Sequence, residues 1–282
     1  MLGALAALGA CHREPTTIPA TGSMTIRGLE VTAYADLASA IIATVPAGTR
    51  AVGFGELHAR VDRASVPSAL VAFTAALPAL APRVSDLVVE TWVVDPGCGA
   101  AAQHTTAALE TAVKRPPATK TEVAVLGDAA RAGGIQPRAM ALTCADYDAL
   151  APGSGDPDPV AMLTITTREL ARVARAALSQ PTTLAGSPAR PWVALYGGAL
   201  HNDRFPAAGV EEWSYAAQLD AATAGHFVEI DLVVPAFAAA DPASQTQPWF
   251  ALVGASDLPP DRILVWRRGE RSYVMLLPQP SR

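Results

Sequence analysis

The strongest constraint on the fold is a series of short, almost wholly apolar segments that alternate with segments of helical periodicity. The apolar segments cover residues 49–54, 86–92, 137–143 and 191–196. Strands that are apolar along their whole length are buried on both faces, which is typical of a parallel sheet with helices packed on each side. The sequence therefore predicts an α/β fold with a mostly parallel central sheet and helices on both faces.

Helical segments and further strands complete this prediction. Apolar spacing and Gly or Pro boundaries predict helices over residues 66–80, 100–113, 122–132, 163–179 and 211–224, the first with Ser65 as its N-cap. Residues 227–234 alternate apolar side chains with Glu229 and Asp231, which predicts a strand with one exposed face. Residues 262–266 and 272–277 flank a polar turn and predict an antiparallel C-terminal hairpin at the edge of the sheet.

Composition narrows the classes of function. Half of the 282 residues are hydrophobic and 17% are charged, with a net charge of −5 and a pI of about 5.5. So much apolar sequence excludes a disordered chain, and the acidic balance argues against a nucleic-acid partner held by a basic surface. The 3 cysteines exclude a disulfide-dense scaffold. No internal repeat is visible, so residues 24–282 are predicted to form a single α/β domain.

The N-terminus carries the features of a bacterial lipoprotein signal. Residues 1–10 are small or apolar and lead into Leu8-Gly9-Ala10-Cys11, which has the form of a lipoprotein cleavage box. We therefore predict a signal-peptide remnant over residues 1–10 and a lipidated tether over residues 11–23, with Cys11 as the lipid attachment site. The positive region that normally starts such a signal is missing, and an apolar segment beside a chance cysteine is the alternative.

This N-terminus predicts a protein anchored by lipid to the bacterial cell envelope. Cys11 is followed by His12 rather than Asp, so resemblance to sorted lipoproteins implies the outer membrane if the cell is Gram-negative. Outside the cytoplasm, Cys98 and Cys144 have the conditions to form a disulfide, because each follows a predicted strand by a few residues. Two free thiols are the alternative, since a sequence gives no Cα–Cα distance.

Acidic and imidazole side chains follow or end three of the predicted strands. The first strand ends in Glu56 and His58, the second contains Glu90 in an otherwise apolar run, and the fourth is followed by His201. Because ligands bind beyond the carboxyl ends of the strands in open α/β sheets, we expect these four side chains to share a site. The set suits a divalent metal such as Zn, Mn or Fe, and it also suits general acid–base catalysis without metal.

Each of these residues also has a purely structural interpretation. Either histidine could cap a helix or sit in a turn, and Glu90 could form an ion pair with Arg138 on the next strand. A shared functional site is the interpretation that explains why acid and imidazole groups recur at three strand ends.

The three motifs together resemble a superfamily that includes erythromycin esterases, ChaN-like haem-uptake lipoproteins and the TraB/Tiki proteins. The matching residues are Gly55-Glu56-Leu57-His58, Glu90 and Gly198-Ala199-Leu200-His201. The resemblance implies an α/β fold, and the cleavage box fits the ChaN-like branch best. ChaN-like members typically have another histidine soon after the first motif, whereas residues 59–63 contain none. Asp62 could replace that histidine as an oxygen ligand, or haem binding could be absent.

Two functions follow, with a degenerate scaffold as a third possibility. The first is a hydrolase of a small-molecule substrate, in which Glu56, His58, Glu90 and His201 bind a metal or act directly as acid and base. The alternative is a non-enzymatic haem- or iron-binding lipoprotein, with Tyr147 or Tyr196 as a candidate axial ligand. The sequence lacks a Gly-Lys-Ser phosphate loop, a Gly-x-Ser-x-Gly elbow and a Cys-x-x-Cys pair, which weakens nucleotide and serine-hydrolase interpretations.

Overall fold

The computed structural model describes residues 22–62, 66–154, 156–181, 190–255, 259 and 261–278. The predicted signal and Cys11 lie outside the described residues, as does Ser65, the predicted N-cap. Gly22 and Ser23, which we assigned to the tether, belong instead to the first strand. Within the described ranges, none of the helices has the length and hydropathy needed to cross a bilayer.

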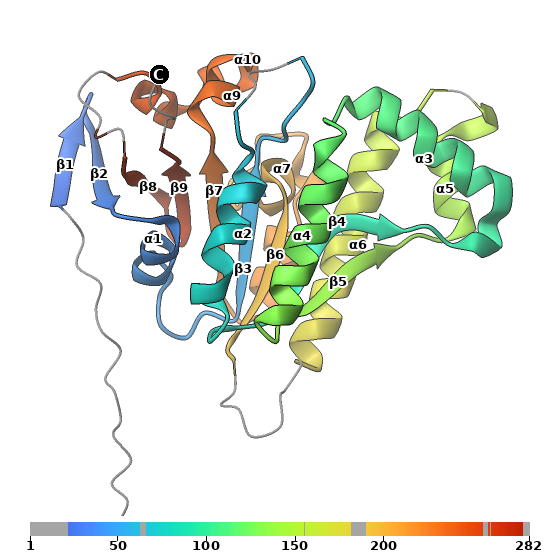
Figure 1. Cartoon of the computed structure of the whole chain (residues 1–282), viewed down its shortest axis with the longest axis horizontal. Helices are drawn as coiled ribbons and strands as arrows, with labels where there is room; N and C mark the ends of the chain where they lie inside the picture. Colours follow the sequence, from blue (N-terminus) through green and yellow to red (C-terminus); the bar gives the residue numbers. More distant parts are fainter. Residues whose placement is uncertain are drawn as a thin grey trace, which may run out of the picture.

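A single sheet of nine strands organises the described part of the chain, in the order β1-β2-β8-β9-β7-β3-β6-β4-β5. The strands are β1 (Gly22–Ile26), β2 (Leu29–Tyr34), β3 (Ala51–Glu56), β4 (Val84–Val93), β5 (Gln136–Ala141), β6 (Trp192–Gly198), β7 (Phe227–Val233), β8 (Ile263–Gly269) and β9 (Ser272–Leu276). The run from β9 through β7, β3, β6 and β4 to β5 is parallel. The predicted α/β fold with a mostly parallel sheet is confirmed (Figure 1).

The antiparallel side of the sheet contains the predicted C-terminal hairpin, β8–β9. A second hairpin, β1–β2, lies outside it and pairs with β8 through β2; the sequence analysis did not predict it. Its two-residue turn consists of Arg27 and Gly28, which both have positive φ angles, 49° and 83°. Such turns match the right-handed twist of paired strands, so the glycine was a usable signal for this hairpin.

Helices cover both faces of the sheet, as predicted. One face packs against α1 (Leu37–Thr44), α2 (Ala69–Leu80) and α4 (Ala118–Ala132), and the other against α6 (Pro159–Ser179) and α8 (Ala216–Ala222). In Figure 1, α2 and α4 cross the near face. Two further helices, α3 (Gly99–Val113) and α5 (Cys144–Leu150), form a separate apolar cluster with α6.

Short helices form parts of the connections between the strands and the longer helices. They are α7 (Ala199–Asn202), α9 (Pro235–Ala239), α10 (Pro242–Gln245) and the 3-10 segments η1 (Pro96–Cys98), η2 (Pro152–Ser154), η3 (Glu211–Trp213) and η4 (Pro248–Leu252). Figure 1 shows α9 and α10 beyond the end of β7. The cavity described below is at this end of the sheet.

Several predicted boundaries need correction. The helix predicted from residue 66 begins at Ala69, because the Ser68 side chain accepts a hydrogen bond from the backbone N–H of Val71 and caps it. The helix predicted over 211–224 is instead η3 followed by the shorter α8. The strand predicted to have an exposed face, β7, lies between β9 and β3, and its Glu229 is fully buried. Arg268 pairs with that carboxylate at 3.2 Å, which is how a charged side chain is accommodated there.

Strand β3 brings the motif residues to one place. In the parallel register Glu56 is aligned with Gly198 of β6 and with Leu232 of β7, so the three strands end at the same edge. Helix α7 begins directly after β6 and packs back onto β3. A Cβ atom at Gly55 would lie 2.6 Å from the Ala199 Cα atom, so only glycine permits this close approach. The strand order thus fixes where His201 sits relative to Glu56.

Candidate functional site

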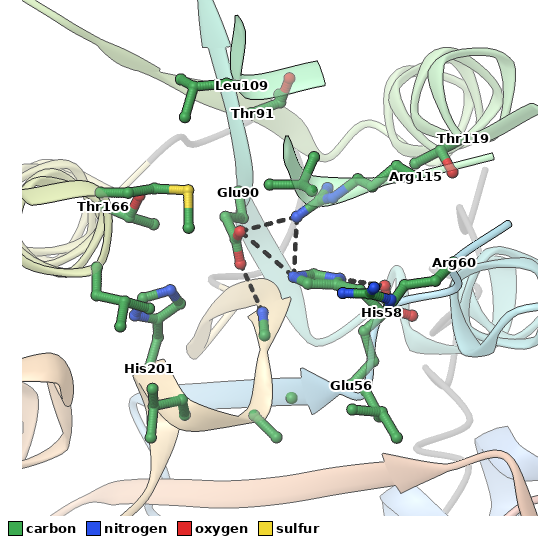
Figure 2. A pocket seen from close by; sticks show the side chains of 18 of the residues that line it. Glu56, His58, Arg60, Glu90, Thr91, Leu109, Arg115, Thr119, Thr166 and His201 are labelled. Atoms are coloured by element: carbon green, nitrogen blue, oxygen red, sulfur yellow. Dashed lines mark hydrogen bonds and ion pairs between the residues drawn. The ribbon is translucent and has the colours of Figure 1, made fainter. Parts of the chain in front are cut away.

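A cavity of about 1500 Å³ opens at the carboxyl ends of β3, β4 and β6. All four predicted site residues line it: Glu56, His58, Glu90 and His201. Figure 2 shows His58 on one side of Glu90 and His201 on the other. The structure therefore brings the four side chains at the strand ends into one cavity, as expected.

His58 lies between two carboxylates. Its Nδ1 atom is 2.8 Å from Glu56 Oε1, and its Nε2 atom is 3.3 Å from Glu90 Oε1. Burial and the Arg115 charge lower the pKa of His58, but the attraction of Glu90 and the hydrogen bonds to Glu56 and Glu90 outweigh them, so the pKa is raised above 6.5. The imidazole is therefore held toward its cationic form.

Arg115 also belongs to the site, although it was not among the predicted site residues. One guanidinium nitrogen lies 2.9 Å from His58 Nε2 and 3.0 Å from Glu90 Oε1 (Figure 2). Arg138, the partner we considered for Glu90, pairs with Asp86 at 2.8 Å instead. Arg115 follows α3 and precedes Pro116-Pro117, so nothing local in the sequence links it to a strand end. Only the path of α3 across the cavity brings it there.

Glu90 fits its position because β6 has glycines beside it. The backbone N–H of Gly198 donates a hydrogen bond of 2.6 Å to Glu90 Oε2. A Cβ atom at Gly197 would lie only 2.7 Å from the same oxygen. Burial raises the pKa of Glu90, but His58, His201 and Arg115 together hold it well below its ordinary value. The site therefore contains an ionised carboxylate between two imidazoles.

Tyr196 supports Glu56 rather than binding a ligand. Its hydroxyl donates a hydrogen bond of 2.6 Å to Glu56 Oε2, and both side chains are buried. Burial and the adjacent Glu56 raise the pKa of Tyr196 well above 10.0, so the hydroxyl keeps its proton. The Tyr196 oxygen is therefore engaged by Glu56, and its role as a haem ligand stays a prediction.

Tyr147, the other predicted haem ligand, does not reach the cavity. It is fully buried in the apolar cluster formed by α3, α5 and α6, and it is not among the cavity-lining residues. The side chain therefore lies outside the cavity, and its role as a haem ligand stays a prediction. The tyrosine follows a predicted strand in sequence, but α5 turns its side chain into the core.

His201 has a different environment from His58. It lies in α7 with 4% of its surface exposed, and its Nδ1 atom is 2.8 Å from Thr167 Oγ1 and 3.1 Å from the Trp213 carbonyl oxygen. Burial lowers its pKa below 6.5, although the nearby Glu90 opposes this shift. The cavity therefore has one imidazole held toward its cationic form and a second held neutral.

The four predicted residues do not assemble as metal ligands. Within the described residues, no group of three His, Cys, Asp or Glu side chains has an arrangement suited to an ion. The physical reason is that both ring nitrogens of His58 are occupied and that the Arg115 guanidinium already contacts Glu90. Asp62, the possible substitute ligand, is exposed and pairs with Arg60 at 2.8 Å. The donor set therefore does not fit a resident cation.

Cys98 and Cys144 form a disulfide, which settles the pairing that the sequence left open. It ties the start of α3 to the start of α5, and α3 supplies one wall of the cavity before it leads to Arg115. Closing a loop with a sequence separation of 46 disfavours the unfolded chain by about 4 kcal/mol in the chain-entropy description. The disulfide therefore stabilises the folded state, and it links α3, which leads to Arg115, covalently to α5.

Comparisons of this chain with family models, with curated proteins and with solved structures find no match. The resemblance to the esterase and ChaN-like superfamily therefore stays a prediction, and the function has to be argued from the site.

Proposed function

We propose that this protein is a metal-independent hydrolase that uses His201 as its general base. The observation that carries the proposal is the pair of imidazoles in one cavity whose surroundings shift their pKa values in opposite directions. Such pairs are how enzymes keep an acid and a base available at the same pH. Glu90, ionised between the two rings, favours the cationic state of both and helps His201 to accept a proton.

The reaction that suits these groups is addition of water to an ester or amide carbonyl. His201 takes a proton from water as the water oxygen attacks the carbonyl carbon. The positive charges of Arg115 and cationic His58 attract the negative charge that develops on the carbonyl oxygen. His58 acts through its charge, because both of its ring nitrogens already face carboxylates. When the tetrahedral intermediate collapses, the bond to the leaving group breaks and His201 returns its proton to that group. The products are an acid and an alcohol or amine, so the atoms balance without a cofactor.

The cavity walls favour a substrate with a large apolar part. Apolar side chains from α3, α4, α6 and η4 surround the polar floor: Leu109, Val113, Val123, Met162, Leu163 and Trp249. The volume of about 1500 Å³ exceeds the ~300–1,000 Å³ that is usual for small-molecule sites. We therefore propose a bulky carbonyl compound as the substrate.

Hydrolysis of a panel of carboxylic esters and amides by the purified protein tests the proposal, with and without a metal chelator. We expect turnover of members with bulky apolar groups, and we expect the chelator to leave it unchanged. Activity that disappears with the chelator and returns with added metal would overturn the metal-independent mechanism. A protein that hydrolyses no member of the panel but binds haem saturably would favour the haem-binding alternative.

The pH dependence of kcat/KM should be bell-shaped. His201 acts as a base only when neutral, so activity falls as the pH drops through its pKa, which lies below 6.5. His58 stabilises negative charge only when cationic, so activity falls as the pH rises through its pKa, which lies above 6.5. Rates measured with a substrate that does not ionise in this range test the prediction. A profile with no basic limb would contradict the role of His58.

We also propose that the protein acts in the bacterial cell envelope, anchored through a lipid on Cys11. The Cys98–Cys144 disulfide supports this location, because disulfides persist in oxidising compartments. Metabolic labelling with a radioactive fatty acid tests it in a bacterial host. We expect the full chain to be labelled and the Cys11→Ala variant to remain unlabelled. An unlabelled wild-type chain would contradict the anchor.

A further inference from the structure

The ring of His201 is fixed at one nitrogen by two acceptors from different parts of the chain. Thr167 lies in α6, and Trp213 is the last residue of η3. Thr167 Oγ1 and the Trp213 carbonyl oxygen are 2.8 Å and 3.1 Å from His201 Nδ1. The Thr167 hydroxyl itself donates to the same carbonyl at 2.8 Å, so the three groups form a closed triangle.

The hydrogen-bond roles in this triangle determine which ring nitrogen carries the proton. A carbonyl oxygen can only accept, so the nitrogen facing it must be an N–H. The single proton of the Thr167 hydroxyl is already directed at the Trp213 carbonyl, so its oxygen is free to accept from that same N–H. In the neutral ring the proton is then on Nδ1 and the lone pair on Nε2.

We propose that Thr167 is the positioning residue of the catalytic base: with the Trp213 carbonyl it locks His201 in the Nδ1–H tautomer and leaves Nε2 to accept the proton. The inference rests on the proposed function. It assigns to a neutral hydroxyl and a backbone carbonyl the role that a carboxylate performs in the serine-protease triad. Among the described residues, the hydrogen-bond partners of His201 Nδ1 are this hydroxyl and this carbonyl rather than a carboxylate. Burial lowers the pKa of His201, so the resting ring is neutral.

The backbone around His201 is held in the same way. The backbone N–H of Tyr215 donates a hydrogen bond of 2.8 Å to the His201 carbonyl oxygen. Thr167 is 1% exposed, so water does not compete for its hydroxyl. The segment that contains Trp213 and Tyr215 therefore holds both the side chain and the main chain of the base, while α6 contributes the hydroxyl.

The test compares Thr167→Val, which keeps the shape but removes the hydroxyl, with Thr167→Ser, which keeps the hydroxyl. We expect Thr167→Val to lower kcat by about 10- to 100-fold, the usual cost of removing a partner that orients a functional histidine, with little change in KM. Thr167→Ser should restore most of kcat. Thr49→Val is the matched control, because Thr49 is 1% exposed and its hydroxyl also donates to a backbone carbonyl, at the opposite end of β3.

Nitrogen NMR of ¹⁵N-histidine-labelled protein measures the tautomer directly and does not depend on activity. We expect the Nδ1 atom of His201 to be the protonated ring nitrogen in the wild type and in Thr49→Val. In Thr167→Val the Trp213 carbonyl loses the hydroxyl that positions it and Nδ1 loses one of its two acceptors, so we expect a mixture of tautomers. The His201→Ala variant identifies the resonance. A wild-type ring protonated on Nε2, or a Thr167→Val variant with an unchanged tautomer, would overturn the inference. If no substrate is turned over, the proposed function fails, and the spectra still decide the role of Thr167.

Discussion

Replacing His201 with alanine should abolish most of the hydrolytic activity while leaving the protein folded. We expect kcat/KM to fall by roughly 100- to 10,000-fold, the range that a positioned general base contributes. The physical reason is that His201 is the cavity imidazole whose surroundings keep it neutral, so it is the imidazole that can accept a proton from water. His58, the other cavity imidazole, is held toward its cationic form and cannot substitute for it.

The measurement is a steady-state assay on the most rapidly hydrolysed ester, with thermal unfolding and circular dichroism to confirm the fold. His104→Ala is the matched control, because His104 lies on the exposed side of α3 and does not line the cavity. It should keep wild-type kinetics. A folded His201→Ala variant with undiminished kcat/KM would eliminate His201 as the base, and a His104→Ala variant with a comparable loss would show that the effect is not specific to the site.

A single methyl group at Gly55 should damage both stability and activity. The added Cβ atom would lie 2.5 Å from Asn202 Oδ1 and 2.6 Å from both Ala199 Cα and Asp231 Oδ1. A flexible side-chain end could move aside, but Ala199 is backbone at the start of α7, so the whole helix must shift on β3. We expect Gly55→Ala to lower the free energy of unfolding by about 1–3 kcal/mol, as overpacking does in well-packed cores.

His201 lies in the displaced helix, so the same substitution should lower kcat/KM more than the loss of stability alone explains. Chemical denaturation and the ester assay on the folded fraction measure the two effects separately. Gly127→Ala is the control: its Cβ would meet only the end of the Arg131 side chain, at 3.6 Å. Because Gly127 is inside α4, alanine there should raise helix stability by up to about 1 kcal/mol. A Gly55→Ala variant as stable and active as wild type would contradict the packing of α7 on β3.

The parts of the fold that could be predicted from the sequence are those strands whose own apolar sequence shows that they are buried. Residues 51–54 and 192–196 are apolar because the strands to which they belong, β3 and β6, are covered on both faces. The β1–β2 hairpin could also have been predicted, because residues 23–26 and 29–33 alternate apolar and polar side chains around the Arg27-Gly28 turn. Glu229 was assigned to an exposed face because the alternation of a single strand does not show which segments pack on each face of the sheet.

The sequence by itself identified the site residues that lie at or just after strand ends: Glu56, His58, Glu90 and His201. They follow from the rule that ligands bind beyond the carboxyl ends of parallel strands. Only the tertiary structure decided their chemistry. Arg115 and Thr167 come from segments with no sequence link to those strand ends, and they set the charge next to His58 and the hydrogen bond at His201. The reason is physical: the protonation of a side chain depends on burial and on charges a few ångströms away, and these neighbours are brought together by packing across the chain.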